Sequence, residues 1–400
     1  MSIAQKIDVR EAPTAAFIAE VRHRFQVEPT IDRELTAKLH RRSQPLTPLA
    51  GLPDIRARLV RFLAAKLGRE FKLHHLGYLA GGASKEQFVF ELEYPGAAQP
   101  REKLVLRRDP CEGITPTDRE REFQLLRAFE GIVPVPSARW LDQQGEFFGR
   151  PALICRFVSG VQKPQHLSGN VTGLGILFPP ATRQHMADKF VGALARIHTA
   201  DLHSADLSAF HRPPAGTAQA EEMHLDWWAR VWFEDRLEEV PLMTITERWL
   251  RRQVPTLDVV SLVHGDYRSG NFLFDEATCK ITAILDWELA HFGDRHCDLA
   301  WIIFQAFLMR DEHGQLLCSG MLSRAEMLAL YRAKSGLTVD EDKLRYFEIF
   351  MLWKGVIIVL ASAPRVALGQ RTHHDILVNW LAGISFVLLD ALRLKLREVM

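Results

Sequence analysis

One stretch of the sequence, residues 261–301, carries polar side chains at offsets that suit phosphoryl transfer. It contains Asp266, then Asn271 five residues later, and Asp286 at the end of an apolar run. Phosphoryl transfer from a nucleotide requires a group that accepts the proton of the attacking hydroxyl, and oxygen ligands for magnesium. An Asp, an Asn five residues on and a strand-terminal Asp supply these groups in a recognised order. The alternative interpretation is a loop rich in turn formers between strands.

The first interpretation gives each polar residue a role. Asp266 is the candidate catalytic base, and Asn271 and Asp286 are the candidate magnesium ligands. Arg268 is a candidate catalytic residue that either holds the Asp266 carboxylate or reaches the transferring phosphate; the sequence leaves both open. We expect His264 to brace the loop rather than to shuttle a proton, and Glu288 to add a supporting contact beside Asp286.

The elements around these residues are expected to be short strands followed by a helix. Apolar residues 262–263 predict a strand that enters the loop, and residues 271–274 and 280–285 predict a β-hairpin. Asp298, near the end of the stretch, is expected to cap or anchor the helix that follows it.

Three segments of this stretch, HGDYRSGNFLFD, ILDWELAHFGD and DLAW, carry a resemblance to a known family. They resemble the phosphotransferase enzyme family, which includes aminoglycoside phosphotransferases and choline kinases, and are similar to the kinase-like domain of acyl-CoA dehydrogenase family members 10 and 11 and its bacterial relatives. The resemblance implies an α+β, protein-kinase-like two-lobed fold, with a small antiparallel-sheet lobe and a larger, mainly helical lobe. Arg295 stands where relatives often have Pro, which is a local departure.

A glycine-rich segment lies between two predicted strands, residues 71–79 and 87–94. Glycines allow backbone N–H groups to approach a phosphate, and a serine hydroxyl adds a donor. Taken alone, this segment is more typical of an ordinary hairpin turn. The resemblance implies that it covers the nucleotide phosphates, so the candidate nucleotide-binding residues are Gly81, Gly82, Ala83 and Ser84.

The next predicted strand, residues 103–107, ends in two arginines. Protein kinases carry a lysine here that holds the nucleotide phosphates and pairs with a glutamate. Arg107 occupies that position, and an arginine fork can hold both partners, although Arg and Lys are not interchangeable. Strand register decides whether Arg107 or Arg108 faces the nucleotide, and alternation favours Arg107.

Residues 118–129 predict a helix with an Asp start and acidic residues in its first turns. The resemblance implies that this helix supplies the paired glutamate, for which Glu122 is the candidate and Glu120 the alternative. A solvated, charged helix face would also explain the pattern.

The rest of the chain gives elements without obvious chemistry. Patterning predicts helices at 33–42, 52–67, 183–199 and 225–240, strands at 137–140 and 147–157, and helices through 323–400 opened by a capping box at Ser323 and Glu326. Helix 225–240 mixes Trp and acidic residues, which indicates either an amphipathic core helix or a pocket for a cationic acceptor. Residues 1–50 are interpreted as a docking or capping extension, and His198 as a structural residue.

Composition limits the function classes. The net charge is +1, from 50 basic and 49 acidic residues, so no global field favours nucleic acid or an anionic membrane. The five scattered cysteines indicate reduced thiols. The N-terminus lacks a signal-peptide pattern, and the apolar runs 349–363 and 380–389 are shorter than the ~20 residues of a membrane helix. We therefore expect a soluble, cytoplasmic protein without a membrane or nucleic-acid partner.

The sequence as a whole favours a small-molecule kinase. Residues 1–158 are expected to form an N-terminal extension and the nucleotide-binding lobe, and residues 159–400 the helical lobe, with a hinge at Gly160 that the resemblance implies. ATP, with GTP not excluded, and Mg²⁺ are the expected cofactors, and the acceptor is a hydroxyl of an aminoglycoside, an amino alcohol or a hydroxyacyl compound. The alternative is a catalytically inactive, kinase-like nucleotide-binding or regulatory protein, which would lack the base or a metal ligand. Acyl transfer or hydrolysis has no supporting G-x-S-x-G motif.

Overall fold

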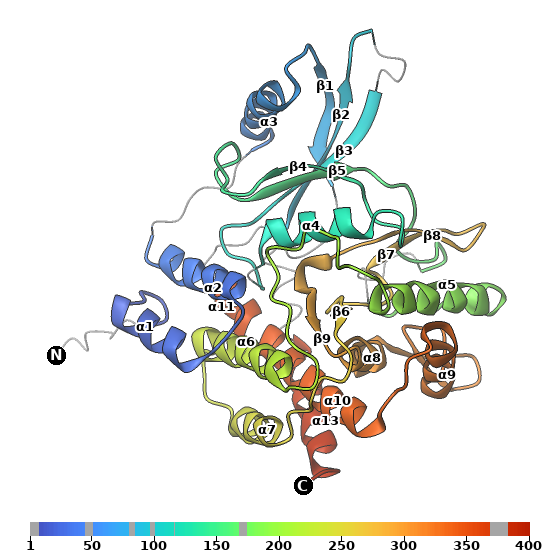
Figure 1. Ribbon diagram of the computed structural model, residues 1–400. Coiled ribbons are helices and arrows are strands. Elements are labelled where there is room, and N and C mark those ends of the chain that lie inside the picture. The colour runs from blue at the N-terminus through green and yellow to red at the C-terminus, as the bar shows by residue number, and fades with distance from the viewer. Residues whose placement is uncertain are drawn as a thin grey trace.

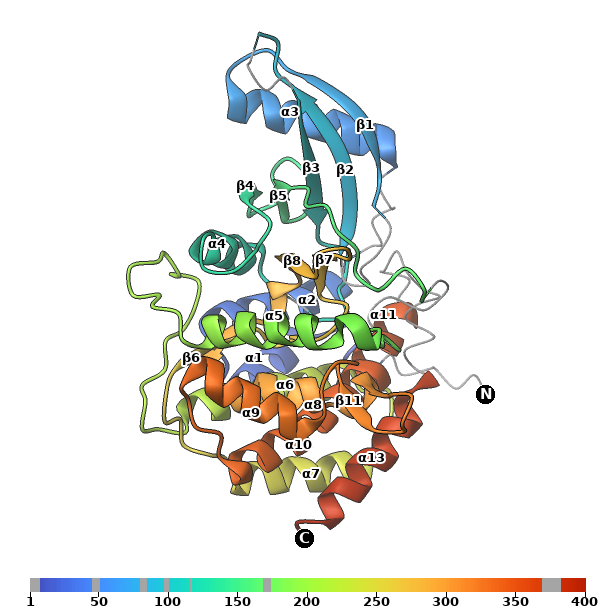
Figure 2. The same ribbon diagram turned by 90° about the vertical axis from the view of Figure 1, so that its right-hand side faces the viewer.

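A five-stranded antiparallel sheet forms the small lobe, shown at the top of Figure 1. The strand order is β1-β2-β3-β5-β4, with bounds β1 Lys72–Tyr78, β2 Glu86–Glu93, β3 Arg101–Arg108, β4 Ala138–Asp142 and β5 Ala152–Arg156. The computed structural model describes residues 8–44, 51–79, 85–96, 101–115, 117–167, 174–368 and 383–400. Two lobes of the expected kinds, one an antiparallel sheet and one mainly helical, are present in these residues (Figures 1 and 2).

Helix α3, Leu52–Leu67, covers one face of this sheet. In β2, every second residue is buried, as expected for a strand with one covered face. Phe88 and Phe90 from β2 join Leu59 and Phe62 from α3 in a small core that is separate from that of the larger lobe. The predicted helix 52–67 is confirmed, and it ends at Gly68, whose positive φ of +59° permits a left-handed cap.

The predicted strand 147–157 is too long, because β5 begins only at Ala152. The residues before it form a turn around the carboxylate of Asp142. This carboxylate accepts the backbone N–H groups of Glu146, Phe147 and Phe148 at 3.0, 3.0 and 2.9 Å. A side chain that satisfies three backbone donors stabilises a turn where the apolar pattern alone predicts a strand.

Helix α4, Arg119–Phe129, packs beneath the sheet against β4 and β5. Asp118 caps it by accepting the backbone N–H of Arg121 at 3.0 Å, so the Asp start predicted from the sequence is confirmed.

The larger lobe is mainly helical and carries three short antiparallel strand pairs in its described residues. Its helices are α5 Pro180–His198, α6 Gln219–Asp235, α7 Pro241–Arg252, α8 His296–Ile303, α9 Arg324–Ser335, α10 Glu341–Val356, the π-helix η3 Ile357–Ser362, α11 Ala363–Leu368 and α13 Ser385–Arg397. The strand pairs are β6 Ser261–Val263 with β9 His291–Gly293, β7 Phe272–Asp275 with β8 Lys280–Ile284, and β10 Leu308–Arg310 with β11 Leu316–Cys318. The predicted hairpin at 271–285 and the capping box at Ser323 and Glu326 are confirmed. The boundary predicted after residue 158 falls between β5 and α5.

Helix α6 differs from the prediction in its bounds, and the burial of its tryptophans decides between the two interpretations given for it. It begins at Gln219 and ends at Asp235 instead of spanning 225–240, and Pro241 then opens the unpredicted helix α7, because proline is favoured in the first turn of a helix. Trp227, Trp228 and Trp232 are 3%, 0% and 5% exposed. These indoles pack in the core, so the amphipathic core interpretation is the correct one.

One helical stretch, Glu341–Leu368, is long and apolar enough by composition to cross a membrane. Its most apolar window is 83% buried inside the protein, so it is accounted for as a core helix. Run 349–363 lies within this buried helix, and residues 380–382 of run 380–389 lie outside the described residues.

Two N-terminal helices, α1 Ala15–Arg24 and α2 Pro29–Arg42, dock against the larger lobe. The docking uses buried charges: Lys38 Nζ lies 2.8 Å from both Glu234 and Asp235, and Arg42 lies 2.7 Å from Asp235. Burial raises the pKa of Asp235, but Lys38 and Arg42 outweigh it, and the pKa is lowered. The extension is thus held by paired charges that are inaccessible to water.

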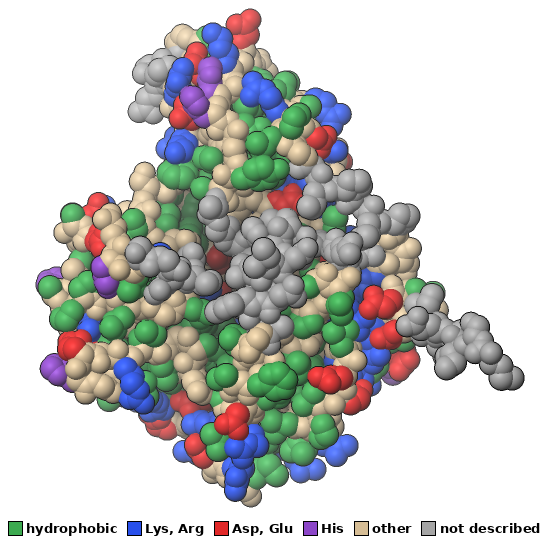
Figure 3. All heavy atoms as spheres, turned by 180° about the vertical axis from the view of Figure 1, so that it is seen from behind, with side chains coloured by type: hydrophobic (Ala, Val, Ile, Leu, Met, Phe, Trp, Pro, Cys, Tyr) green, Lys and Arg blue, Asp and Glu red, His purple; other side chains and the backbone are tan. Residues whose placement is uncertain are grey.

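The surface is mixed in charge. On the face shown in Figure 3, basic and acidic side chains alternate among apolar and neutral ones over the described residues. This distribution accords with the net charge of +1.

Candidate active site

A tight turn after β6 presents Asp266. Gly265, which precedes it, has a φ of +82°, and a Cβ there would lie 2.5 Å from the backbone oxygen of Leu289. Only glycine fits this position, because both the conformation and the close approach exclude a side chain. The turn is therefore fixed by the sequence itself.

Asp298 braces this turn from α8. Its two carboxylate oxygens accept the backbone N–H groups of His264 and Gly265 at 2.7 and 2.8 Å. His198 Nε2 donates to the same carboxylate at 3.0 Å. Burial alone would raise the pKa of Asp298, but these hydrogen bonds outweigh it and lower the pKa.

The hydrogen bonds of Asp298 test what the sequence predicted for Asp298 and for His198. Asp298 lies in the first turn of α8, where the N-cap is Arg295, so the predicted capping role of Asp298 is wrong: its carboxylate serves the loop. His198 is a structural residue, as predicted, and its other ring nitrogen lies 2.8 Å from the hydroxyl of Tyr331.

His264 holds the loop from within. Its Nε2–H donates to the backbone oxygen of Leu285 at 2.9 Å, and its Nδ1 accepts the backbone N–H of Asp266 at 3.3 Å. Burial lowers the pKa of His264. Both ring nitrogens are thus occupied by backbone groups, as expected for a brace.

Three donors hold the Asp266 carboxylate. Trp301 Nε1 donates to Oδ1 at 2.6 Å and Arg268 Nε to the same oxygen at 3.0 Å, while Asn271 Nδ2 donates to Oδ2 at 2.6 Å. Arg268 therefore holds the carboxylate in this structure, which was one of the two options that the sequence left open. The Asp266 side chain remains 21% exposed, enough for a ligand to reach it.

Asp286 follows β8 in a left-handed conformation, with φ 60° and ψ 50°. Arg107 Nη2 lies 2.9 Å from its carboxylate. Burial raises the pKa of Asp286; Arg107 opposes this effect, and the nearby carboxylates of Glu288 and Asp266 add to it. Asp266 and Asp286 are thus close enough to feel each other's charge.

Arg107 links the two lobes. Its guanidinium pairs with Glu122 of α4 and with Asp286 of the larger lobe. Arg108 points elsewhere, donating to Glu86 at 2.8 Å, and Glu120 accepts from Gln143. The structure therefore brings the predicted Arg107 and Glu122 together and leaves their alternatives outside the group.

Four further charged residues surround this pair, and sequence reasoning missed three of them. Lys85 Nζ lies 3.1 Å from Asp109 and 3.6 Å from Glu288, and Arg119 Nη2 lies 3.4 Å from Glu288. Arg119 also pairs with Glu122. Of this set only Glu288 was noted, as a supporting contact two residues after Asp286; a hint for Lys85 was its place directly after the glycine-rich segment.

The remaining predicted nucleotide-binding residues, Gly81, Gly82, Ala83 and Ser84, lie outside the described residues.

The residues predicted to hold magnesium fit a hard divalent cation. Asn271 uses its amide nitrogen on Asp266, so its carbonyl oxygen is the atom it would offer to a metal. Asp286 offers a carboxylate whose pKa is raised by burial and, against the opposing Arg107, by the neighbouring carboxylates of Glu288 and Asp266. Oxygen donors in an acidic surrounding are the set that Mg²⁺ prefers.

A second group of potential ligands lies behind the loop but does not suit a metal. Ligand atoms of His224, His291 and Cys297 lie within 4.8 Å of one another. Trp228 Nε1–H donates to His224 Nε2 at 3.2 Å, which puts the proton of a neutral ring on Nδ1, so His224 offers no free lone pair. The buried ammonium of Lys354 also acts on all three groups and opposes a further cation.

The family can now be stated. The model of the phosphotransferase enzyme family matches residues 75–322, more than half of the sequence. The chain belongs to this family, and the match includes the loop, the hairpin and Arg107.

Curated relatives repeat the resemblance seen in the motifs. Acyl-CoA dehydrogenase family member 10 of Mus musculus is 27% identical over 283 residues, covering 68% of this chain and 25% of the relative. Acyl-CoA dehydrogenase family member 11 of Rattus norvegicus is 25% identical over 283 residues, covering 68% of this chain and 35% of the relative. The chain thus spans between a quarter and about a third of the length of these relatives.

Solved structures share the fold. A candidate aminoglycoside phosphotransferase from Ralstonia eutropha superposes with a TM-score of 0.62 at 22% identity, covering 86% of this chain and 98% of that chain. Aminoglycoside 2'-phosphotransferase-IIIa in complex with GDP gives 0.51 at 14%, covering 86% and 99%. A mutant aminoglycoside phosphotransferase with ADP and hygromycin B gives 0.50 at 18%, covering 82% and 97%. The α+β, protein-kinase-like two-lobed fold expected from the sequence is confirmed.

Proposed function

We propose that this protein is an ATP- and magnesium-dependent phosphotransferase that phosphorylates a hydroxyl group of a small molecule. The observation that carries the proposal is the convergence of Asp266, Asn271 and Asp286 with Arg107. Asn271 contacts Asp266 at 2.6 Å, Arg107 contacts Asp286 at 2.9 Å, and the two carboxylates interact electrostatically. A base, oxygen ligands and a phosphate-binding cation at one place are the parts that phosphoryl transfer requires.

Asp266 is the residue that would take or orient the proton of the acceptor hydroxyl. Its carboxylate is held at both oxygens and is partly exposed, so it can face an acceptor while keeping its orientation. Arg268, on the same carboxylate, fixes it and carries a positive charge to the place where the phosphoryl group transfers.

Arg107 and Glu122 form the cation–carboxylate pair that would hold the nucleotide phosphates, with Gly81, Gly82, Ala83 and Ser84 covering them. Mg²⁺ bound by Asn271 and Asp286 would neutralise charge on the phosphate oxygens. ATP is the proposed phosphoryl donor. GTP is the alternative donor in the test below, because related folds are known with ADP and with GDP.

The acceptor belongs to one of three chemical classes: aminoglycosides, amino alcohols or hydroxyacyl compounds. One structural neighbour binds hygromycin B, which supports the first class. The curated relatives are named as acyl-CoA dehydrogenases, which supports the third. The five free cysteines support a cytoplasmic location as part of the proposal.

The test is release of nucleoside diphosphate from magnesium–ATP or magnesium–GTP across a panel of these acceptors. We expect acceptor-stimulated release that Asp266→Asn lowers by about 10²- to 10⁴-fold, because the change removes the base but keeps the shape of the side chain. Tight nucleotide binding without turnover for any acceptor would favour the inactive, kinase-like alternative. Absence of nucleotide binding would exclude both.

A further inference from the structure

A buried lysine touches the catalytic loop from behind. Lys354, on α10, is 1% exposed, and its Nζ donates to the backbone oxygen of Gly265 at 2.8 Å. Among the described residues, no carboxylate lies within salt-bridge distance of this ammonium group. Burial lowers the pKa of Lys354. A buried cation without an ionic partner costs free energy, so a purely structural position would favour an apolar residue.

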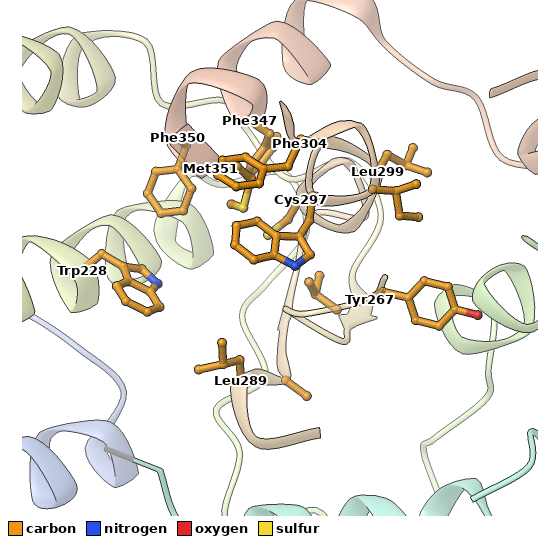
Figure 4. Close-up of a cluster of buried hydrophobic side chains, with 14 of the residues drawn as sticks. Trp228, Tyr267, Leu289, Cys297, Leu299, Phe304, Phe347, Phe350 and Met351 are labelled. Atoms are coloured by element: carbon orange, nitrogen blue, oxygen red, sulfur yellow. The ribbon is translucent and has the colours of Figure 1, made fainter. Parts of the chain in front are cut away.

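Aromatic rings take the place of a counter-ion. The Nζ atom lies 4.6 Å from the ring centroid of Trp301 and 5.1 Å from that of Trp228, both within the range of a cation–π contact. Figure 4 shows the cluster of buried apolar side chains to which Trp228 belongs, together with Phe350 and Met351 from α10.

The same indole that faces Lys354 also holds the candidate base. Trp301 Nε1–H donates to Asp266 Oδ1 at 2.6 Å. The ring is fixed by stacking on Phe304, with ring centroids 4.8 Å apart, and by edge contact with Phe307 at 5.3 Å. Trp301 therefore joins the ammonium group to the Asp266 carboxylate through one rigid side chain.

We propose that Lys354 and Trp301 are positioning residues that together fix the carboxylate of Asp266 for phosphoryl transfer. Lys354 holds the backbone at Gly265, one residue before the base, and draws the face of Trp301 toward itself; Trp301 aims its N–H at the base. A cation on the face of an indole also polarises the ring and makes its N–H a stronger donor. The proposal rests on the proposed phosphotransferase function, yet its geometry can be tested without turnover.

The first experiment observes the indole N–H groups of the full chain, labelled with ¹⁵N at tryptophan. Trp301→Phe identifies the Trp301 resonance by its loss. We expect this proton far downfield and slow to exchange, as for a short hydrogen bond to a carboxylate, and we expect Asp266→Asn to move it upfield. Lys354→Met, which removes the charge but keeps the length, should also move it upfield. If Lys354→Met leaves the position of the Trp301 resonance unchanged, the proposed link between the two residues is wrong.

The second experiment separates positioning from stability. Trp301→Phe keeps a smaller aromatic ring near Lys354 and removes the N–H donor, so we expect kcat to fall about 10- to 100-fold with little change in the KM of the nucleotide. The matched control is Trp353→Phe on α10, which also removes one buried indole N–H, here donated to the backbone oxygen of Met243 at 3.2 Å. The control should lower the melting temperature comparably and leave kcat unchanged.

The outcomes distinguish the two proposals. Wild-type protein without acceptor-dependent turnover refutes the proposed function, while the resonance experiment still decides whether Lys354 and Trp301 act on Asp266. Active protein in which Trp301→Phe keeps full kcat, or loses no more than Trp353→Phe does, refutes the positioning role. If the Lys354→Met protein does not fold, the kcat and melting temperature of Trp301→Phe, compared with those of Trp353→Phe, decide the positioning role.

Discussion

Two sets of buried titratable groups, one on each side of the loop that carries Asp266, are kept in opposite states. Toward the small lobe they are charged and paired: burial raises the pKa of Glu122, but Arg107 and Arg119 outweigh it and the pKa is lowered. Behind the loop, where Lys354 and Asp298 are charged, Glu221 and His291 are neutral: burial raises the pKa of Glu221 to about 8 and lowers that of His291 to about 4. The same desolvation therefore leaves Glu122 ionised and Glu221 and His291 uncharged.

The difference lies in the partners. Glu122 contacts two guanidinium groups, whereas Glu221 accepts a backbone N–H from Asp294, whose own carboxylate repels it. Opposite charge nearby keeps a buried group ionised, and its absence makes the group neutralise. Paired charges suit the side that the proposed function assigns to the nucleotide phosphates.

Removal of one charge from the paired side should have the largest effect. Glu122→Gln keeps the shape but leaves Arg107 and Arg119 buried without their shared carboxylate. We expect the free energy of unfolding to fall by about 3–5 kcal/mol, the cost of breaking a buried pair from one side. Urea unfolding followed by circular dichroism measures it. A loss below about 1 kcal/mol would show that this side does not depend on pairing.

Much of this contrast could not be predicted from the sequence. The loop, the hairpin and Arg107 could be predicted because local spacing encodes them: Asp266 and Asn271 are five residues apart, and strand alternation selects Arg107 over Arg108. Lys354 could not be predicted, because its partner Gly265 is 89 residues away and only the packing of α10 against α8 brings them together.

Two errors have the same origin. The length of β5 was overestimated because the pattern of residues 147–157 is apolar, while the turn depends on Asp142 outside that run. Asp298 was assigned to its own helix because capping is a local rule, yet its carboxylate contacts His264 and Gly265 more than thirty residues earlier.

Neutrality behind the loop makes a pH prediction of intermediate size. With its folded pKa raised from 4.5 to about 8, Glu221 binds a proton in the folded state between these values that the unfolded chain has lost. Its contribution is present below pH 4.5 and lost as the pH rises to 8. His291, lowered from 6.5 to about 4, acts with the opposite sign and only below pH 6.5. Stability should therefore fall by about 2 kcal/mol between pH 6.5 and pH 8.

The matched variant is Glu221→Gln, which imitates the protonated carboxyl and can still accept the Asp294 N–H, now 2.9 Å from Glu221 Oε1. Urea unfolding at pH 6.5 and at pH 8 should show a smaller loss in the variant than in the wild type. Equal losses in the two proteins would mean that Glu221 is not held neutral.

The smallest effect is expected for a carboxylate–guanidinium pair that is exposed to solvent. Asp54 and Arg58 form a salt bridge of 2.7 Å on the surface of α3, with side chains 46% and 30% exposed. Asp54→Asn should change the free energy of unfolding by about 0.5 kcal/mol or less, because water screens the pair. This variant is the control for Glu122→Gln in the same lobe. A comparable loss in both would remove burial as the cause.

The docking of α2 bears on where the folding unit ends. The segment recognised by the family model, residues 75–322, contains Glu234 and Asp235, but their partners Lys38 and Arg42 precede it, and Ser362, which donates to Asp235 at 2.9 Å, follows it. A protein trimmed to the recognised segment would keep the buried carboxylates and lose their cations. The family match thus covers a smaller region than the one that holds these charge pairs, and expression or domain-grafting work should take its limits from the charge partners rather than from the family match.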